Sequence, residues 1–340
     1  MVVYVKSGDR LGNGMIITRT PVRITFVGGG TDIKEYYSQH GGAVVNAAID
    51  RYIYVILNRP FDDKIRVRYT ENEVVDRVDD VRHPLMREAL RYLGISGGID
   101  VVSIADIPTN IAGNGLGSSS AFLVGMLNAL HAWKGERVAK DRLAEEAFEI
   151  ERNILGQAGG KQDQYIAAYG GMHMWEFMRD GRVVSNPVEL DDRNAEELRS
   201  HILLLFLGKE HSSTSIHDGQ RGGIGDKVSS YTEMKSYAYE MYRDISNGML
   251  DRVGRLLDMN WRLKRTLDSG ITSDDIDRIY KIGMDNGASG GKLIGAGGGG
   301  FMMFYADPST HKSIIGALPE LRPLKFDFDR LGSTLLSVRD

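Results

Sequence analysis

Residues 113–121 read GNGLGSSSA, and this stretch decides how the chain is expected to fold and act. It follows a β-branched segment at residues 100–106 and precedes residues 121–133, whose apolar spacing and alanine and leucine content predict a buried helix. The small residues therefore lie at a helix N-terminus, where free backbone N–H groups and the helix dipole attract an anion. The stretch predicts a phosphate-binding loop. A serine-capped helix after a flexible loop is the structural alternative.

The predicted phosphate contacts come from glycines, which let the backbone approach closely, and from serines, whose hydroxyls can donate to phosphate or bind magnesium. The residues are Gly113, Asn114, Gly115, Leu116, Gly117, Ser118, Ser119 and Ser120.

Two further glycine clusters stand out in a chain with the unusually high count of 41 glycines. VGGGTD, at residues 27–32, follows a β-branched segment and predicts a strand-to-helix turn. GAGGGG, at residues 295–300, lies between apolar strands and requires a tight turn with close backbone approach. The P-loop motif GxxxxGK[ST] occurs nowhere in the sequence, and VGGGTD lacks the last glycine of GxGxxG. A P-loop enzyme is excluded, and a nicotinamide-dependent oxidoreductase is a distant alternative.

The composition is that of an ordinary globular protein, with 42% hydrophobic and 26% charged residues in a chain of 340. The net charge of -4 gives no reason to expect a nucleic-acid partner. The absence of cysteine excludes disulfides and thiol nucleophiles and suits the cytoplasm. No signal peptide is recognisable, and the longest strongly apolar run, residues 202–207, is too short to span a membrane. Nothing indicates an oligomeric state.

A domain boundary is expected in the polar segment at residues 189–200, which has few apolar residues. Before it, residues 171–185 predict a hairpin with an Asp-Gly turn. After it come an apolar strand near residues 201–208 and a helical region at about 231–267. The predicted domains are residues 1–190 and 191–340.

An amphipathic helix is predicted from residues 141 to 155, and Glu151 falls inside its apolar stripe. Glu145, Glu146 and Glu149 are expected on its other faces. A carboxylate that faces inward needs a partner, either a magnesium ion beside a triphosphate or a structural arginine.

Two more residues are candidates for catalysis. Asp163, after a glycine-rich loop, could accept the proton of an attacking hydroxyl. Arg23, near a strand end, could stabilise a transferred phosphoryl group or hold Asp163 ionised. Taken alone, either residue would more simply be interpreted as a solvated surface side chain. The eight histidines form no HExxH pair, so a zinc site is not expected.

In this order, RTPVRITFVGGGTD, GNGLGSSSA and KLIGAGGGGFM resemble the three motifs of the GHMP kinases. The resemblance implies a two-domain α+β protein. Its N-terminal domain would resemble the second domain of ribosomal protein S5, and its C-terminal domain would be ferredoxin-like, with ATP and substrate between them. GGGTD together with GGKQDQYIAAYGG, residues 159–171, is most similar to family members that act on heptose 7-phosphates.

The resemblance also implies roles for individual residues. Residues 113–120 would bind the phosphates of ATP, Ser119 and Glu151 would bind Mg2+, and Asp163 with Arg23 would act at the accepting hydroxyl. The implied substrate contacts are Gly29, Gly30, Thr31, Asp32, Lys161, His211, Gly298 and Gly299. Two features depart from the family pattern: residues 109–112 lengthen the link between a proline and the glycine loop, and histidine stands at 211 where arginine is usual.

The implied reaction moves the γ-phosphoryl group of ATP to the anomeric C1 hydroxyl of D-glycero-D-manno-heptose 7-phosphate. The product would be the 1,7-bisphosphate used for nucleotide-heptose synthesis. Another sugar, such as fucose or a hexose, is one alternative substrate, because a few side chains outside the motifs set this choice. A sugar- and ATP-binding regulator without catalysis is a second alternative.

Overall fold

The first sheet is built around two long strands. The computed structural model describes residues 14–107, 115–208 and 225–337. Strand β1 (Ile16–Val27) pairs antiparallel with β2 (Gly42–Asn58), as their β-branched composition predicts. Between them lies the short helix α1 (Lys34–His40).

Eight strands make up this sheet, in the order β12-β1-β2-β5-β3-β4, with β6 beside the first half of β2 and β7 beside β6. The other strands are β3 (Ile65–Arg68), β4 (Asn72–Val75), β5 (Ile99–Ala105), β6 (Met172–Phe177), β7 (Val183–Pro187) and β12 (Thr334–Ser337). The predicted hairpin at residues 171–185 is confirmed as β6 and β7.

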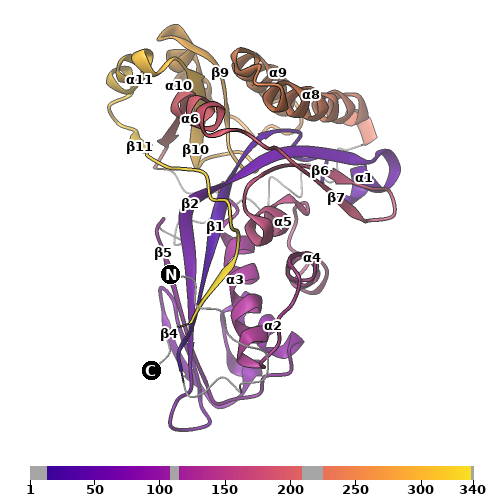
Figure 1. The fold of residues 1–340 in the computed structure, drawn as a ribbon, viewed down its shortest axis with the longest axis vertical. Helices are drawn as coiled ribbons and strands as arrows, with labels where there is room; N and C mark the ends of the chain where they lie inside the picture. The colour runs from indigo at the N-terminus through magenta and orange to yellow at the C-terminus, as the bar shows by residue number, and fades with distance from the viewer. Residues whose placement is uncertain (1–13, 108–114, 209–224, 338–340) are drawn as a thin grey trace.

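One face of this sheet is covered by helices (Figure 1). Helix α3 (Ser118–Trp133) packs on β1 and β2 and is apolar on nearly all sides, because other helices enclose it. Those helices are α2 (Pro84–Tyr92), α4 (Lys140–Phe148) and α5 (Gln162–Tyr169).

The second sheet has four antiparallel strands in the order β11-β8-β10-β9. They are β8 (Ile202–Phe206), β9 (Ala288–Leu293), β10 (Phe301–Ala306) and β11 (Arg322–Leu324). This order, with helices between β8 and β9 and between β10 and β11, is the ferredoxin-like topology. The helices beside it are α6 (Asp192–His201), α9 (Val253–Lys264), α10 (Asp274–Asp285) and α11 (His311–Ala317). The expected α+β architecture is confirmed.

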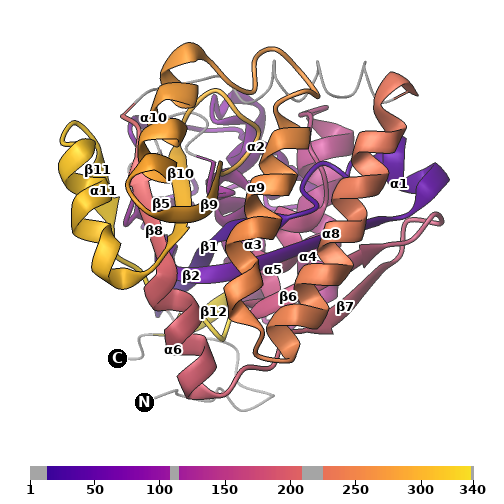
Figure 2. The same cartoon turned by 90° about the horizontal axis from the view of Figure 1, so that it is seen from above.

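Helix α8 (Val228–Ser246) connects the two halves. It packs beside α9 and also contacts β1 and β2, and Figure 2 shows α8 and α9 side by side above the first sheet. Short 3-10 helices lie at Val78–Asp80, Gly225–Lys227, Leu250–Arg252 and Pro308–Thr310. Within the described ranges, no helix is long and apolar enough to cross a membrane.

Two segments differ from the sequence expectation. The polar segment expected as a domain boundary forms α6, whose N-terminus is capped by the Asp191 side chain accepting from the Asn194 N–H. The helix predicted for residues 141–155 changes from α to π winding at Glu149–Ile154. This wider turn rotates the following residues, so that Ile154 is 47% exposed, although an unbroken α-helix would place it on the apolar stripe with Ile150.

Candidate active site

A cavity lies where the two halves meet. Its first wall is formed by the end of β1, the turn at residues 29–33 and the loop at 159–163. Its second wall comes from the end of α9, from β9 and from the turn at residues 295–296. Two of the three glycine clusters thus line one cavity, as expected for a site between two domains.

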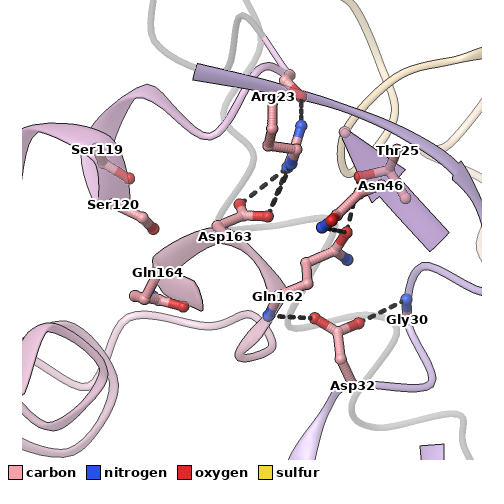
Figure 3. A network of polar contacts seen from close by, with 12 residues as sticks. Arg23, Thr25, Gly30, Asp32, Asn46, Ser119, Ser120, Gln162, Asp163 and Gln164 are labelled. Carbon is pink, nitrogen blue, oxygen red and sulfur yellow. Dashed lines mark hydrogen bonds and ion pairs between the residues drawn. The ribbon is translucent and has the colours of Figure 1, made fainter. Parts of the chain in front are cut away.

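Arg23 and Asp163 form a bidentate ion pair in this cavity. Nε of Arg23 donates to Oδ1 of Asp163 at 2.8 Å, and Nη2 donates to Oδ2 at 2.9 Å. Both side chains are largely buried, with exposed fractions of 7% and 18%. In Figure 3, Asp163 lies between Arg23 and the start of α3. The structure therefore brings the two predicted catalytic residues together in a fork that fixes the carboxylate.

The glycine loop approaches this pair closely. Gly117 is the N-cap of α3 in the left-handed conformation, and a Cβ there would lie 3.3 Å from the Asp163 carboxylate. Nη1 of Arg23 donates to the Gly115 carbonyl, and the backbone N–H of Arg23 donates to the Leu116 carbonyl at 3.0 Å. Of the predicted phosphate loop, Gly113 and Asn114 lie outside the described residues.

The third glycine cluster packs against the same loop. A Cβ on Gly295 would lie 2.4 Å from the Cα of Gly115, and a Cβ on Gly115 would lie 2.4 Å from the Ile294 carbonyl oxygen. Both glycines also have positive φ angles. Side chains are excluded at this contact, which accounts for glycine in both clusters.

Glu151 is fully buried beside the N-terminus of α3, as its place in the apolar stripe of its own helix predicts. Its Oε1 accepts from the Ser119 hydroxyl at 2.7 Å, and its Oε2 accepts from the Ser120 hydroxyl and the Gln164 amide, each at 2.7 Å. Nη1 of Arg152 lies 3.6 Å from Oε1. Of the two partners expected for this inward carboxylate, a magnesium ion or a structural arginine, the arginine is adjacent, and hydroxyls of the glycine loop lie beside it.

Oxygen ligands for Mg2+ are present at this point. The Ser119 hydroxyl and the Glu151 carboxylate are hard donors, and Mg2+ commonly takes one or two protein ligands and completes its shell with phosphates and water. Among the described residues, no group of three or more His, Cys, Asp and Glu could hold a metal alone. The donor set therefore fits a magnesium ion that arrives with a nucleotide.

Asp32 occupies the other side of the cavity and is 2% exposed. It accepts from the Gly30 N–H at 2.9 Å and from the Gln162 N–H at 3.2 Å. Burial, followed by the nearby charge of Asp163, raises the pKa of Asp32 above its usual value. Gly29 and Gly30 line the cavity beside it.

Four other predicted substrate contacts lie away from the cavity lining. The fully buried Thr31 hydroxyl lies within hydrogen-bond distance of the Gly28 and Ala43 carbonyls, and Nζ of Lys161 binds the Glu145 carboxylate at 3.0 Å. Both side chains thus bind other parts of the protein in this structure, and their contacts with a sugar stay predictions. Gly298 and Gly299 are absent from the lining, and His211 lies outside the described residues.

Three cations of the cavity were not predicted: Arg152, Lys264 and Lys292. Nζ of Lys292 donates to the carbonyls of Thr25 and Phe26 at 2.9 Å and ties β9 to β1. A sequence signal existed for Lys264, which shares the buried stripe of α9 with Leu257 and Trp261. This is the same argument that identified Glu151.

The similarity to known proteins agrees with this geometry. The family model described as GHMP kinases N terminal domain matches residues 81–171, and the one described as GHMP kinases C terminal matches residues 241–322. A Campylobacter jejuni protein named D-glycero-alpha-D-manno-heptose 7-phosphate kinase is 32% identical, over 92% of this chain and 96% of its own. This chain belongs to the GHMP kinases. It is an ATP-dependent phosphotransferase, which removes the oxidoreductase alternative.

Other GHMP kinases share the fold. A solved structure titled D-glycero-D-manno-heptose 1-phosphate kinase, from Bacteroides thetaiotaomicron, superposes with a TM-score of 0.79 at 24% identity, over 96% of this chain and all of that one. A putative sugar kinase from Campylobacter jejuni gives 0.77 at 28% identity, over 96% and 99%. The L-fucokinase/L-fucose-1-P guanylyltransferase of Bacteroides fragilis is 28% identical, over 93% of this chain and 37% of its own length.

Proposed function

We propose that this GHMP kinase transfers the γ-phosphoryl group of ATP to the C1 hydroxyl of D-glycero-D-manno-heptose 7-phosphate. The product is the 1,7-bisphosphate, a precursor of nucleotide-activated heptose. One observation carries the reaction type: the bidentate pair of Arg23 and Asp163 faces a cavity next to the glycine loop that opens α3. The substrate is supported by the relative named as a heptose 7-phosphate kinase, which matches along nearly its whole length.

The chemistry assigned to the pair is simple. The C1 oxygen forms a bond to the γ-phosphorus, the bond from that phosphorus to the β,γ-bridging oxygen breaks, and its electron pair leaves on ADP. The hydroxyl proton goes to the Asp163 carboxylate or is oriented by it. Arg23 keeps that carboxylate in position and favours its ionised form. Asp32, beside Gly29 and Gly30, is placed to accept from sugar hydroxyls.

The phosphates of ATP are assigned to the loop of residues 113–120, where the N-terminus of α3 provides backbone N–H groups. Ser119 and Glu151 would hold Mg2+, which neutralises charge on the β- and γ-phosphates when bound. An enzyme that consumes ATP works where ATP is maintained, so we expect it in the cytoplasm.

A second sugar substrate is favoured by one observation. The fucokinase relative matches 93% of this chain, so an L-fucose acceptor is the main competitor of heptose 7-phosphate. A catalytically silent regulator is less consistent with the site, because Asp163, Arg23 and Glu151 lie together.

The test measures ADP release with magnesium and ATP across heptose 7-phosphate, free heptose, fucose, mannose, galactose and mevalonate. We expect rapid turnover of heptose 7-phosphate alone. Asp163→Asn should lower kcat at least about 1000-fold while the affinity for ATP stays unchanged. Asp62→Asn is a matched control, because Asp62 forms a similar fork with Arg66 on the exposed surface.

Each other outcome has a distinct meaning. Turnover of fucose alone would keep the kinase and replace the substrate. No turnover of any sugar, despite tight ATP binding, would support the regulator. Full activity of the Asp163→Asn variant would refute the assigned catalytic pair.

A further inference from the structure

Lys264 is a charged cavity residue that the proposed reaction does not yet use. It ends α9, and its side chain enters the cavity from the wall opposite Arg23 and Asp163. The residue is only 5% exposed. Burying an ammonium group without a charged partner costs several kcal/mol, so a lysine at this place needs an explanation.

The protein satisfies only part of its hydrogen-bonding capacity. Nζ of Lys264 donates to the carbonyl of Gly295, in the turn that packs on Gly115 of the phosphate loop. This is its single hydrogen bond to the part of the chain that the structure describes. An ammonium has three N–H donors, so two remain for groups that enter the cavity.

The charges that face Lys264 come from four elements. Arg23 lies on β1, Asp32 in the turn after β1, Asp163 on α5 and Lys292 on β9. Nζ of Lys292 donates to two carbonyls of β1. Lys264 is therefore the cation of the second wall whose remaining N–H groups can reach toward Asp32 and Asp163. Its ammonium thus lies next to both the phosphate loop and the groups assigned to the acceptor.

On the basis of the proposed function, we infer that Lys264 is a further catalytic residue, whose ammonium donates to the phosphoryl group as it passes from ATP to the acceptor oxygen. Charge on the transferred group is spread over its equatorial oxygens, and a cation fixed in a dry site stabilises that charge. Lys264 keeps its proton throughout. The bonds formed and broken are those given above, and the hydroxyl proton still goes to Asp163.

The same surroundings predict a dependence on pH. Burial, followed by the charge of Arg23, lowers the pKa of Lys264 to about 8, against the opposing effect of Asp32 and Asp163. In the nucleotide-free enzyme the ammonium is therefore lost as the pH rises through about 8. The kcat/KM for ATP, which reports the free enzyme, should fall over this range.

The experiment compares Lys264→Met, Lys264→Arg and the wild type. We expect Lys264→Met to lower kcat about 100- to 1000-fold, with less than about a threefold change in the dissociation constant of a non-hydrolysable ATP analogue. Lys264→Arg, which stays charged, should recover at least tenfold over the methionine variant and move the alkaline fall in kcat/KM to higher pH. Lys235→Met is the control, because Lys235 also donates to a carbonyl, that of His40, but lies on α8 outside this cavity.

Two results would overturn the inference. One is a methionine variant that keeps more than a third of the wild-type kcat. The other is a loss of ATP binding and thermal stability together, with an unchanged pH profile, since Lys264 would then only hold the Gly295 turn.

If heptose 7-phosphate is not a substrate, the same variants are compared on whichever sugar reacts, or on the slow transfer of the phosphoryl group to water. Lys264→Met must lower that rate as well, so this inference and the proposed substrate can fail independently.

Discussion

At the scale of single residues, two buried glutamates from one helical segment serve different purposes. Glu151 contacts Ser119 and Ser120 at the start of α3. Glu146 is 7% exposed and binds the ring Nε2 of His131 at 2.6 Å and Nε of Arg142 at 2.7 Å. Glu151 lies at the site, whereas Glu146 joins α4 to α3, so the same substitution should affect catalysis only at Glu151.

Glu151→Gln should remove the charge that attracts magnesium while keeping the shape of the side chain. We expect kcat to fall at least about 100-fold and the magnesium requirement to rise. The free energy of unfolding should also fall by about 1–3 kcal/mol, because one amide oxygen cannot accept from all three donors that Glu151 binds. Glu146→Gln should likewise lower that free energy by about 1–3 kcal/mol but leave kcat intact. Magnesium titrations of activity and urea unfolding of both variants check this, and equal effects on kcat would contradict it.

A buried residue of the site could be predicted where a charged side chain falls within the apolar stripe of a helix. Glu151 was found in this way, and Lys264 carried the same signal in α9. Glu146 was assigned to a face other than that of Glu151, and its burial was not predicted, because no pattern within its own helix reveals a histidine on α3. The Thr31 and Lys161 contacts were inferred from motif position alone, which does not determine whether a side chain points toward the cavity or binds another part of the protein.

At the scale of elements, the position of α9 depends on a backbone contact with β9. A Cβ on Gly290 would lie 1.7 Å from the carbonyl oxygen of Gly254, so the helix and strand touch without side chains between them. Several strands and the helices α3, α4, α8 and α9 follow from hydrophobic period and were predicted, whereas α2, α10 and α11 were not. The depth at which α9 sits, and hence the place of Lys264, depends on contacts between distant segments, which a period cannot reveal.

Gly290→Ala should push α9 away from β9. We expect a loss of about 3 kcal/mol in the free energy of unfolding, or more, and a lower kcat because Lys264 moves with the helix. Gly316→Ala, in α11, is the matched control. A Cβ there meets nothing within 4 Å, so it should stabilise the protein by up to about 1 kcal/mol. Chemical unfolding of both variants gives the comparison, and a neutral Gly290→Ala would show that α9 can shift at no cost.

At the scale of the whole molecule, the two halves are connected at more than one place. We keep residues 1–190 and 191–340 as the proposed domains. Strand β12, however, follows the second sheet in sequence and pairs with β1 in the first, from Ile16 opposite Ser337 to Arg19 opposite Thr334. Helix α8 packs on the strands β1 and β2 as well as on α9. Unfolding of either half therefore exposes surface of the other, and we expect a single cooperative transition.

The stability of the whole molecule should fall in mild acid because of His173. Burial lowers the pKa of His173 to about 4, below its usual value near 6.5, where the ring packs against Trp175. Between these two pH values the imidazole of His173 is protonated in the unfolded chain but not in the folded one. Its contribution to the free energy of unfolding is therefore fully present above about pH 6.5 and is lost as the pH falls toward 4. Between pH 7 and pH 5 the contribution is about 1–2 kcal/mol. His173→Gln should reduce the pH dependence of urea unfolding by this amount, and identical slopes for variant and wild type would contradict the prediction.

The pairing of β12 with β1 has a consequence for biosynthesis. A ribosome makes β1 among the first segments of this chain and β12 only after all four strands of the second sheet. The edge of β1, the strand that carries Arg23, therefore stays open throughout most of translation. An open strand edge is a template for pairing with other chains, so the nascent protein needs protection at this edge until the last strand emerges.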